Sequence, residues 1–207
     1  MRVIDKSYLI KSYLDEILPN AKCELNYTKD YELLIATMLS AQTTDKRVNE
    51  VTKILFTKYD TIDKLSNASI SDLEDIIRPL GTQKKKSINV KSIAQILYNN
   101  YDGVVLNDRA ILESLPGVGR KTANVVLSNI YNENVIAVDT HVSRVSKRLG
   151  LAGVNDTPLE IEKKLIKIFD KNLSKLHHQL VLFGRYYCKA KNPECSNCRL
   201  KDICKRG

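Results

Sequence analysis

The sequence predicts an all-α protein, and three observations predict it. Apolar residues recur at helical intervals in successive segments of the chain. Capping residues and helix-ending turns separate these segments, and no alternating apolar run bracketed by hairpin turns is found. The 207 residues, of which 43% are hydrophobic and 28% charged, have the composition of a globular protein with a sizeable core.

The first half of the chain supplies the predicted helices 1–18, 31–39, 45–59, 71–79 and 84–98. The first of these carries its apolar residues on one face and stops before Pro19, and the second is apolar enough to be buried all round. Thr44 or Asp45 can cap the third. Ser71 and Glu74 have the spacing of a capping box, which predicts that the fourth helix begins there.

The second half supplies the predicted helices 108–114, 120–130, 140–149, 157–169 and 176–187. Asp108 can cap the first of them, and Gly150 suits the C-terminal end of the third. Thr157 and Glu160 form a second capping-box pattern, with a proline in the first helical position. The polar stretch 131–134 is the best candidate for a domain boundary.

The chain is strongly basic, with 33 Lys and Arg against 24 Asp and Glu and a formal net charge of +9. This excess favours a polyanionic partner, which means nucleic acid or an anionic membrane surface. No stretch has the ~20 apolar residues that cross a bilayer, and the N-terminal residues lack the apolar core of a signal peptide. We therefore expect a cytoplasmic protein with reduced cysteines and no membrane partner.

A glycine-rich turn at residues 115–119 precedes a predicted helix that begins with Arg120 and Lys121. Glycines before a helix N-terminus leave backbone N–H groups free to bind an anion, most often phosphate. The positive end of the helix dipole, with Arg120 beside it, favours the uncharged and nucleophilic form of the Lys121 amine. Asp139 supplies a carboxylate that can stabilise a cation or move a proton. These features indicate covalent chemistry on a nucleic-acid sugar, although a glycine turn with surface charges near it has the same pattern.

Four cysteines at the C-terminus follow the pattern C-x6-C-x2-C-x5-C, and they are Cys188, Cys195, Cys198 and Cys204. In a reducing compartment such a group indicates a metal site rather than disulfides. Only one pair has the two-residue spacing usual for zinc, so the spacing favours a single [4Fe-4S] cluster over zinc. Lys189 and Lys191 lie in the basic loop after the first ligand, where they either contact phosphates or only face solvent.

Four stretches together resemble the endonuclease III family of DNA glycosylases. They are LSAQTTD at 39–45, LPGVGRKTANVV at 115–126, AVDTHVSRV at 137–145 and the cysteine pattern. The resemblance runs from about residue 31 to residue 204. It implies a six-helix barrel domain at 22–132, with a helix–hairpin–helix motif at 108–130, and an iron–sulfur domain formed by 1–21 and 133–207, whose cluster loop is 188–204.

The resemblance also implies the chemistry. The Lys121 amine would attack C1′ of a flipped-out nucleotide and expel an oxidised pyrimidine from duplex DNA, assisted by Asp139 across a cleft between the domains. β-Elimination would then nick the strand at the abasic site. Residues expected to contact DNA are Gln42, Thr82, Gly117, Gly119, Arg120, His141, Arg144, Lys189 and Lys191. Gln42 would fill the space left by the flipped base, whereas for His141 and Arg144 packing and phosphate neutralisation are favoured over direct chemistry.

One loop departs from the family pattern. After Gly81, where the family often places a leucine that wedges into the duplex, residues 82–86 read Thr-Gln-Lys-Lys-Lys. Three lysines predict more phosphate contact and less wedging. Two alternatives stay open, a monofunctional mismatch or adenine glycosylase, which typically lacks a lysine at position 121, and a non-catalytic DNA-binding module. We expect a monomer associated with the nucleoid.

Overall fold

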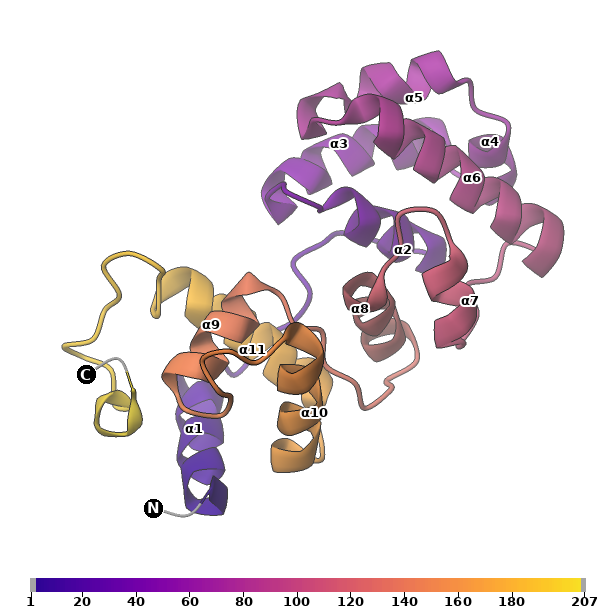
Figure 1. Cartoon of the computed structure of the whole chain (residues 1–207). Helices are drawn as coiled ribbons and strands as arrows, with labels where there is room; N and C mark the ends of the chain where they lie inside the picture. Colours follow the sequence, from indigo (N-terminus) through magenta and orange to yellow (C-terminus); the bar gives the residue numbers. More distant parts are fainter. Residues whose placement is uncertain (1–2, 206–207) are drawn as a thin grey trace. The chain divides into compact units, whose positions relative to one another are not determined.

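The computed structural model describes residues 3–205, and helices joined by loops account for this part of the chain, with no strand in it (Figure 1). The all-α prediction is confirmed. The chain divides into two compact units: unit 1 is Met1–Cys23 with Asn132–Gly207, and unit 2 is Glu24–Tyr131. None of the helices between residues 3 and 205 has the length and apolar content that a bilayer span requires.

Unit 2 consists of the helices α2 (Asp30–Leu39), α3 (Asp45–Lys58), α4 (Ile62–Ser66), α5 (Ile70–Ile77), η1 (Arg78–Leu80), α6 (Gln83–Tyr101), α7 (Arg109–Ser114) and α8 (Arg120–Ile130). The long helix α6 packs against α4 and α5, while α8 packs against α2 and α7 (Figure 1). All residues of α2 from Tyr31 to Leu39 are buried, as its nearly continuous apolar sequence predicts. The pair α7 and α8 is therefore anchored on a buried helix.

The predicted start of α5 is wrong by two residues. Ser69, not Ser71, is the N-cap, and its hydroxyl accepts a hydrogen bond from the Asp72 backbone N–H at 3.2 Å. Ser71 lies inside the helix. A serine caps a helix wherever its hydroxyl reaches a free backbone N–H, and helix ends read from a sequence pattern are uncertain by one or two residues.

Unit 1 consists of α1 (Val3–Ile17), α9 (Thr140–Arg148), α10 (Pro158–Phe169), α11 (Leu173–Tyr186) and η2 (Lys201–Ile203). Met1 and Arg2, at the start of the first predicted helix, lie outside the described residues. The helices α1, α9, α10 and α11 share one core, which includes Leu14, Val145, Leu165 and Phe183. This core places the N-terminal helix and the C-terminal third of the chain in one unit.

Two predicted helix ends in unit 1 are confirmed. Thr157 and Glu160 form the capping box: the Thr157 hydroxyl accepts from the Glu160 N–H at 3.3 Å, and the Glu160 carboxylate accepts from the Thr157 N–H at 2.7 Å. Gly150 follows α9 with a φ of 66°, the left-handed conformation that favours glycine. Both ends were predictable because a local side-chain or backbone preference decides them.

Candidate nucleic-acid and metal sites

The hairpin between α7 and α8 depends on Gly117. Its φ is 77°, and a Cβ atom at this position would overlap the side-chain amide of Asn89 on α6. The turn is closed by a hydrogen bond from the Val118 N–H to the Leu115 carbonyl at 3.0 Å. Gly119 differs, because its φ is −106° and a Cβ there would meet nothing within 4 Å. Gly117 shapes the turn, and Gly119 leaves open space in front of the helix.

Lys121 lies in the first turn of α8 and is exposed. Arg120 before it is also exposed, whereas every residue from Thr122 to Ser128 is buried. Gly119 is the N-cap and offers no side chain to accept from the first backbone N–H groups of the helix. The structure thus presents a lysine at a rigidly held helix N-terminus whose donors are open to an anion.

Asp139 is the N-cap of α9. Its carboxylate accepts a hydrogen bond from the Val142 N–H at 2.7 Å, and its side chain stays partly exposed. The carboxylate therefore stabilises the start of α9, where the helix dipole also favours a negative charge. Asp139 belongs to unit 1 and Lys121 to unit 2.

Arg144 makes internal contacts in unit 1. Its guanidinium donates to the Gly184 carbonyl at 2.7 Å and to the Cys188 carbonyl at 3.3 Å, and it lies 3.2 Å from Nδ1 of His141. Burial and, second, the neighbouring Arg148 lower the pKa of the Arg144 guanidinium. These contacts connect α9 to the end of α11, so packing is the described role of Arg144.

The four cysteines lie around one cavity. It has a volume of about 600 Å³, and its lining includes all four thiols with Tyr13, Phe183 and Tyr187. Burial raises the pKa of the Cys198 thiol, and the negative charges of the other three cysteines raise it further. Among the described residues, no three His, Cys, Asp or Glu side chains form a group that could hold one metal ion. Four thiols around one cavity are a donor set for soft metal ions, and a positively charged group bound there would relieve the repulsion between thiolates.

Arg148, the last residue of α9, contacts the cysteine segment, and the sequence alone does not predict this role. Its guanidinium donates to the Cys188 sulfur at 3.3 Å, to the Cys188 carbonyl at 3.2 Å and to the Lys189 carbonyl at 2.7 Å. These are charge-assisted hydrogen bonds to the start of the loop that follows α11. The only sequence signal is a basic residue in the last turn of a predicted helix.

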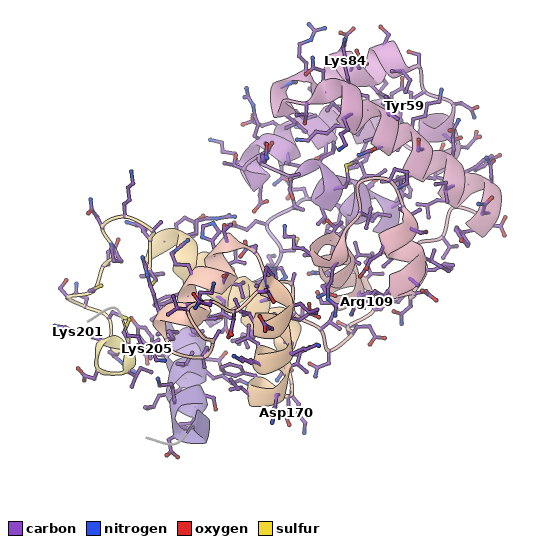
Figure 2. The ribbon with its side chains drawn as sticks, viewed as in Figure 1. Tyr59, Lys84, Arg109, Asp170, Lys201 and Lys205 are labelled. Carbon is purple, nitrogen blue, oxygen red and sulfur yellow. The ribbon has the colours of Figure 1, made fainter. Side chains whose placement is uncertain are left out.

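The basic residues of the cysteine segment are not equivalent. Lys189 forms an ion pair with Glu194 at 2.8 Å, while Lys191 is exposed. Lys201 and Lys205 lie in the same segment, at the left of Figure 2, and both are exposed. Of the two lysines predicted to contact phosphate, Lys189 is therefore already paired with a carboxylate.

Gln42 and Thr82 are exposed residues of unit 2 with left-handed backbones, at φ values of 59° and 46°. The expectation that three lysines follow Thr82 at the surface is wrong for the last of them. Lys84, labelled in Figure 2, and Lys85 are exposed, whereas Lys86 is only 5% exposed. The helical geometry of α6 turns Lys86 inward, and a count of charges does not predict this.

Comparison with known proteins identifies the class of protein to which this chain belongs. Residues 35–171 match the family model of the HhH-GPD superfamily base excision DNA repair proteins. The chain is 44% identical over 195 residues to endonuclease III of Bacillus subtilis (strain 168), covering 94% of this chain and 89% of that protein. A non-covalent endonuclease III–DNA complex and a trapped endonuclease III–DNA covalent intermediate are solved structures with 44% identity and a TM-score of 0.94. Each match covers 99% of this chain. It covers 96% of the endonuclease III chain in the non-covalent complex and 97% of that in the covalent intermediate.

The chain therefore belongs to the endonuclease III family of base excision DNA repair enzymes, which are DNA glycosylases that also act as lyases at abasic sites.

Proposed function

We propose that this chain removes oxidised pyrimidines from duplex DNA through a Schiff base on Lys121 and then cuts the strand at the abasic site. The observation that carries the proposal is the exposed Lys121 at the N-terminus of α8, directly after a turn that only glycine can form at position 117. Family membership supports it, as does the solved covalent intermediate of a related endonuclease III.

In the proposed reaction the uncharged Lys121 amine attacks C1′ of the sugar, and the bond between C1′ and the damaged base breaks. The base leaves with the electron pair of that bond and takes up a proton, while Asp139 stabilises the positive charge on the sugar or accepts the amine proton. The C1′–O4′ bond of the sugar then breaks, O4′ takes up a proton, and the opened sugar is joined to Lys121 as an iminium ion. This ion acidifies the C2′–H bond. Loss of that proton expels the 3′ phosphate by breaking the C3′–O bond, which cuts the strand.

The remaining DNA contacts follow from exposure. We propose that the open N–H groups after Gly119 bind a backbone phosphate, with Arg120 beside them. Gln42 enters the space of the flipped nucleotide, which must leave the stack before C1′ can be attacked. Thr82 approaches the same duplex, and Lys191 contacts phosphate more strongly than Lys189, because Glu194 neutralises Lys189.

We propose that Cys188, Cys195, Cys198 and Cys204 hold a [4Fe-4S] cluster. Bound there, the cluster supplies thiolate–iron bonds that fix a loop-rich segment with little core of its own. Arg148 orients the first of these cysteines from α9. The proposed partner is duplex DNA carrying an oxidised pyrimidine or an abasic site, bound by a monomer in the cytoplasm.

Borohydride trapping on a thymine glycol duplex tests the proposal, because borohydride reduces a protein–DNA Schiff base to a permanent crosslink. We expect a crosslink with the wild-type chain and none with Lys121→Gln. A wild-type chain that releases the base without a crosslink is a monofunctional glycosylase. A chain that only binds DNA, without base release, is a binding module, and either result overturns the proposal.

A further inference from the structure

Lys86 is a buried lysine without a carboxylate among its described partners. Its ammonium donates to the Leu80 carbonyl at 3.0 Å, to the Ala41 carbonyl at 3.1 Å and to the Thr43 hydroxyl at 3.4 Å. An ammonium has three protons, so these three acceptors satisfy it completely. Burial alone lowers the pKa of the amine. A buried charge without an opposite charge is costly, and such a group persists where its hydrogen bonds determine a geometry.

The three acceptors belong to two turns that are far apart in the sequence. Ala41 and Thr43 flank Gln42, while Leu80 lies two residues before Thr82. The Thr43 hydroxyl adds a direct link, because it donates to the Leu80 carbonyl at 3.2 Å. Gln42 and Thr82 are the non-glycine residues of these turns with left-handed backbones, a conformation that such residues rarely adopt unless the surrounding structure imposes it. Both side chains are exposed.

We propose that Lys86 is a positioning residue that joins the Gln42 turn and the Thr82 turn into one rigid DNA-probing element. This proposal rests on the proposed function, because it assigns the two turns to the recognition of a damaged nucleotide. Lys86 itself does not touch DNA. Its ammonium holds two backbone carbonyls, and the exposed side chains of Gln42 and Thr82 meet the duplex at a fixed spacing. Entering a base stack requires such rigidity, because a loose turn would lose conformational freedom on insertion.

Equilibrium binding tests the proposal in a Lys121→Gln background, which prevents turnover. A duplex with thymine glycol and the same duplex without damage are compared at several salt concentrations. We expect Lys86→Met to weaken binding to the damaged duplex about 30-fold and to the undamaged duplex less than about 3-fold. The slope of log affinity against log salt should not change, because a residue that binds no phosphate releases no counterion.

Lys85→Met is the matched control, since it removes the same charge from the exposed neighbour on α6. It should keep the preference for damaged DNA. If Lys86→Met weakens both duplexes equally and lowers the salt slope by about 0.9, Lys86 contacts phosphate and the proposal is wrong. Thr43→Val removes the hydroxyl link and leaves Lys86 in place. If Lys86→Met does not fold, the preference of Thr43→Val for damaged over undamaged DNA tests the proposal instead. An unchanged preference in Thr43→Val would then overturn the proposal.

The trapping experiment on the wild-type chain separates the two proposals. Absence of a wild-type crosslink contradicts the proposed chemistry whatever the variants do. A wild-type crosslink, together with unchanged lesion preference in both Lys86→Met and Thr43→Val, contradicts only the role of Lys86.

Discussion

Gly117 and Gly119 stand two residues apart in the hairpin and meet different physical demands. Gly117 has a backbone conformation that side chains disfavour, and the Asn89 amide occupies the space where a Cβ atom would lie. Gly119 has an ordinary φ and open space around it. The first glycine is needed by the fold, and the second is needed only if a ligand approaches the helix N-terminus.

Alanine substitutions should separate these demands. We expect Gly117→Ala to lower the free energy of unfolding by about 1–3 kcal/mol, because it adds both backbone strain and an overlap. Gly119→Ala should cost less than about 1 kcal/mol but weaken binding to duplex DNA about 10-fold, because its methyl group faces the proposed phosphate. Chemical denaturation and DNA titration measure the two effects. If Gly119→Ala binds DNA as the wild-type chain does, the phosphate does not lie against this turn.

At the level of the element, Asp139 has two separable roles. It caps α9 through the Val142 N–H, and in the proposed reaction its carboxylate assists at the sugar. Asparagine caps a helix about as well as aspartate but carries no charge. Alanine carries no charge and also cannot cap the helix.

We therefore expect Asp139→Asn to keep the free energy of unfolding within about 0.5 kcal/mol of the wild-type value, and Asp139→Ala to lower it by about 1 kcal/mol. Both variants should release base from a thymine glycol duplex at least about 100-fold more slowly. Thermal unfolding and single-turnover base release are the measurements. Full activity of Asp139→Asn would show that the residue is only a cap.

The elements also show how far the sequence predicts this molecule. A helix with a clear apolar period and a local capping signal, such as α10, is found where it was expected. The five-residue helix α4 was missed because it is too short to display a period. In the candidate sites, the glycine turn and the cysteine pattern are visible in the sequence because their spacing is local. Lys86 and Arg148 are not, because Ala41 and Thr43, which bind Lys86, and Cys188, which binds Arg148, lie about 40 residues away from them in the sequence and only the folded chain brings them together.

At the scale of the whole molecule, we expect the two units to differ in how they respond to acid. The chain has three histidines, His141, His177 and His178, and all of them belong to unit 1. His178 lies in α11 and is 8% exposed, with its ring 4.9 Å from the ring of His177. Burial and, second, the charge of His177 lower the pKa of His178 to about 3.

Because of this shift, we expect the stability of unit 1 to decrease as the pH drops below neutral. Between pH 6.5 and pH 3 the unfolded chain binds a proton at His178 and the folded chain does not, so stability rises with pH in this window and is lost as the pH falls. For an unfolded pKa of about 6.5, the loss between pH 7 and pH 5 is about 2 kcal/mol. Unit 2 contains no histidine and should change much less over this range.

Hydrogen exchange followed by mass spectrometry measures the two units in one experiment, once the exchange rates are corrected for the intrinsic effect of pH. The opening free energy of α11 should fall by about 2 kcal/mol from pH 7 to pH 5, while that of α2 stays nearly constant. In His178→Gln the fall in α11 should largely disappear, because glutamine does not titrate. An equal fall in both helices, or a fall in α11 that persists in His178→Gln, would mean that groups other than the buried imidazole of His178 govern the response to acid.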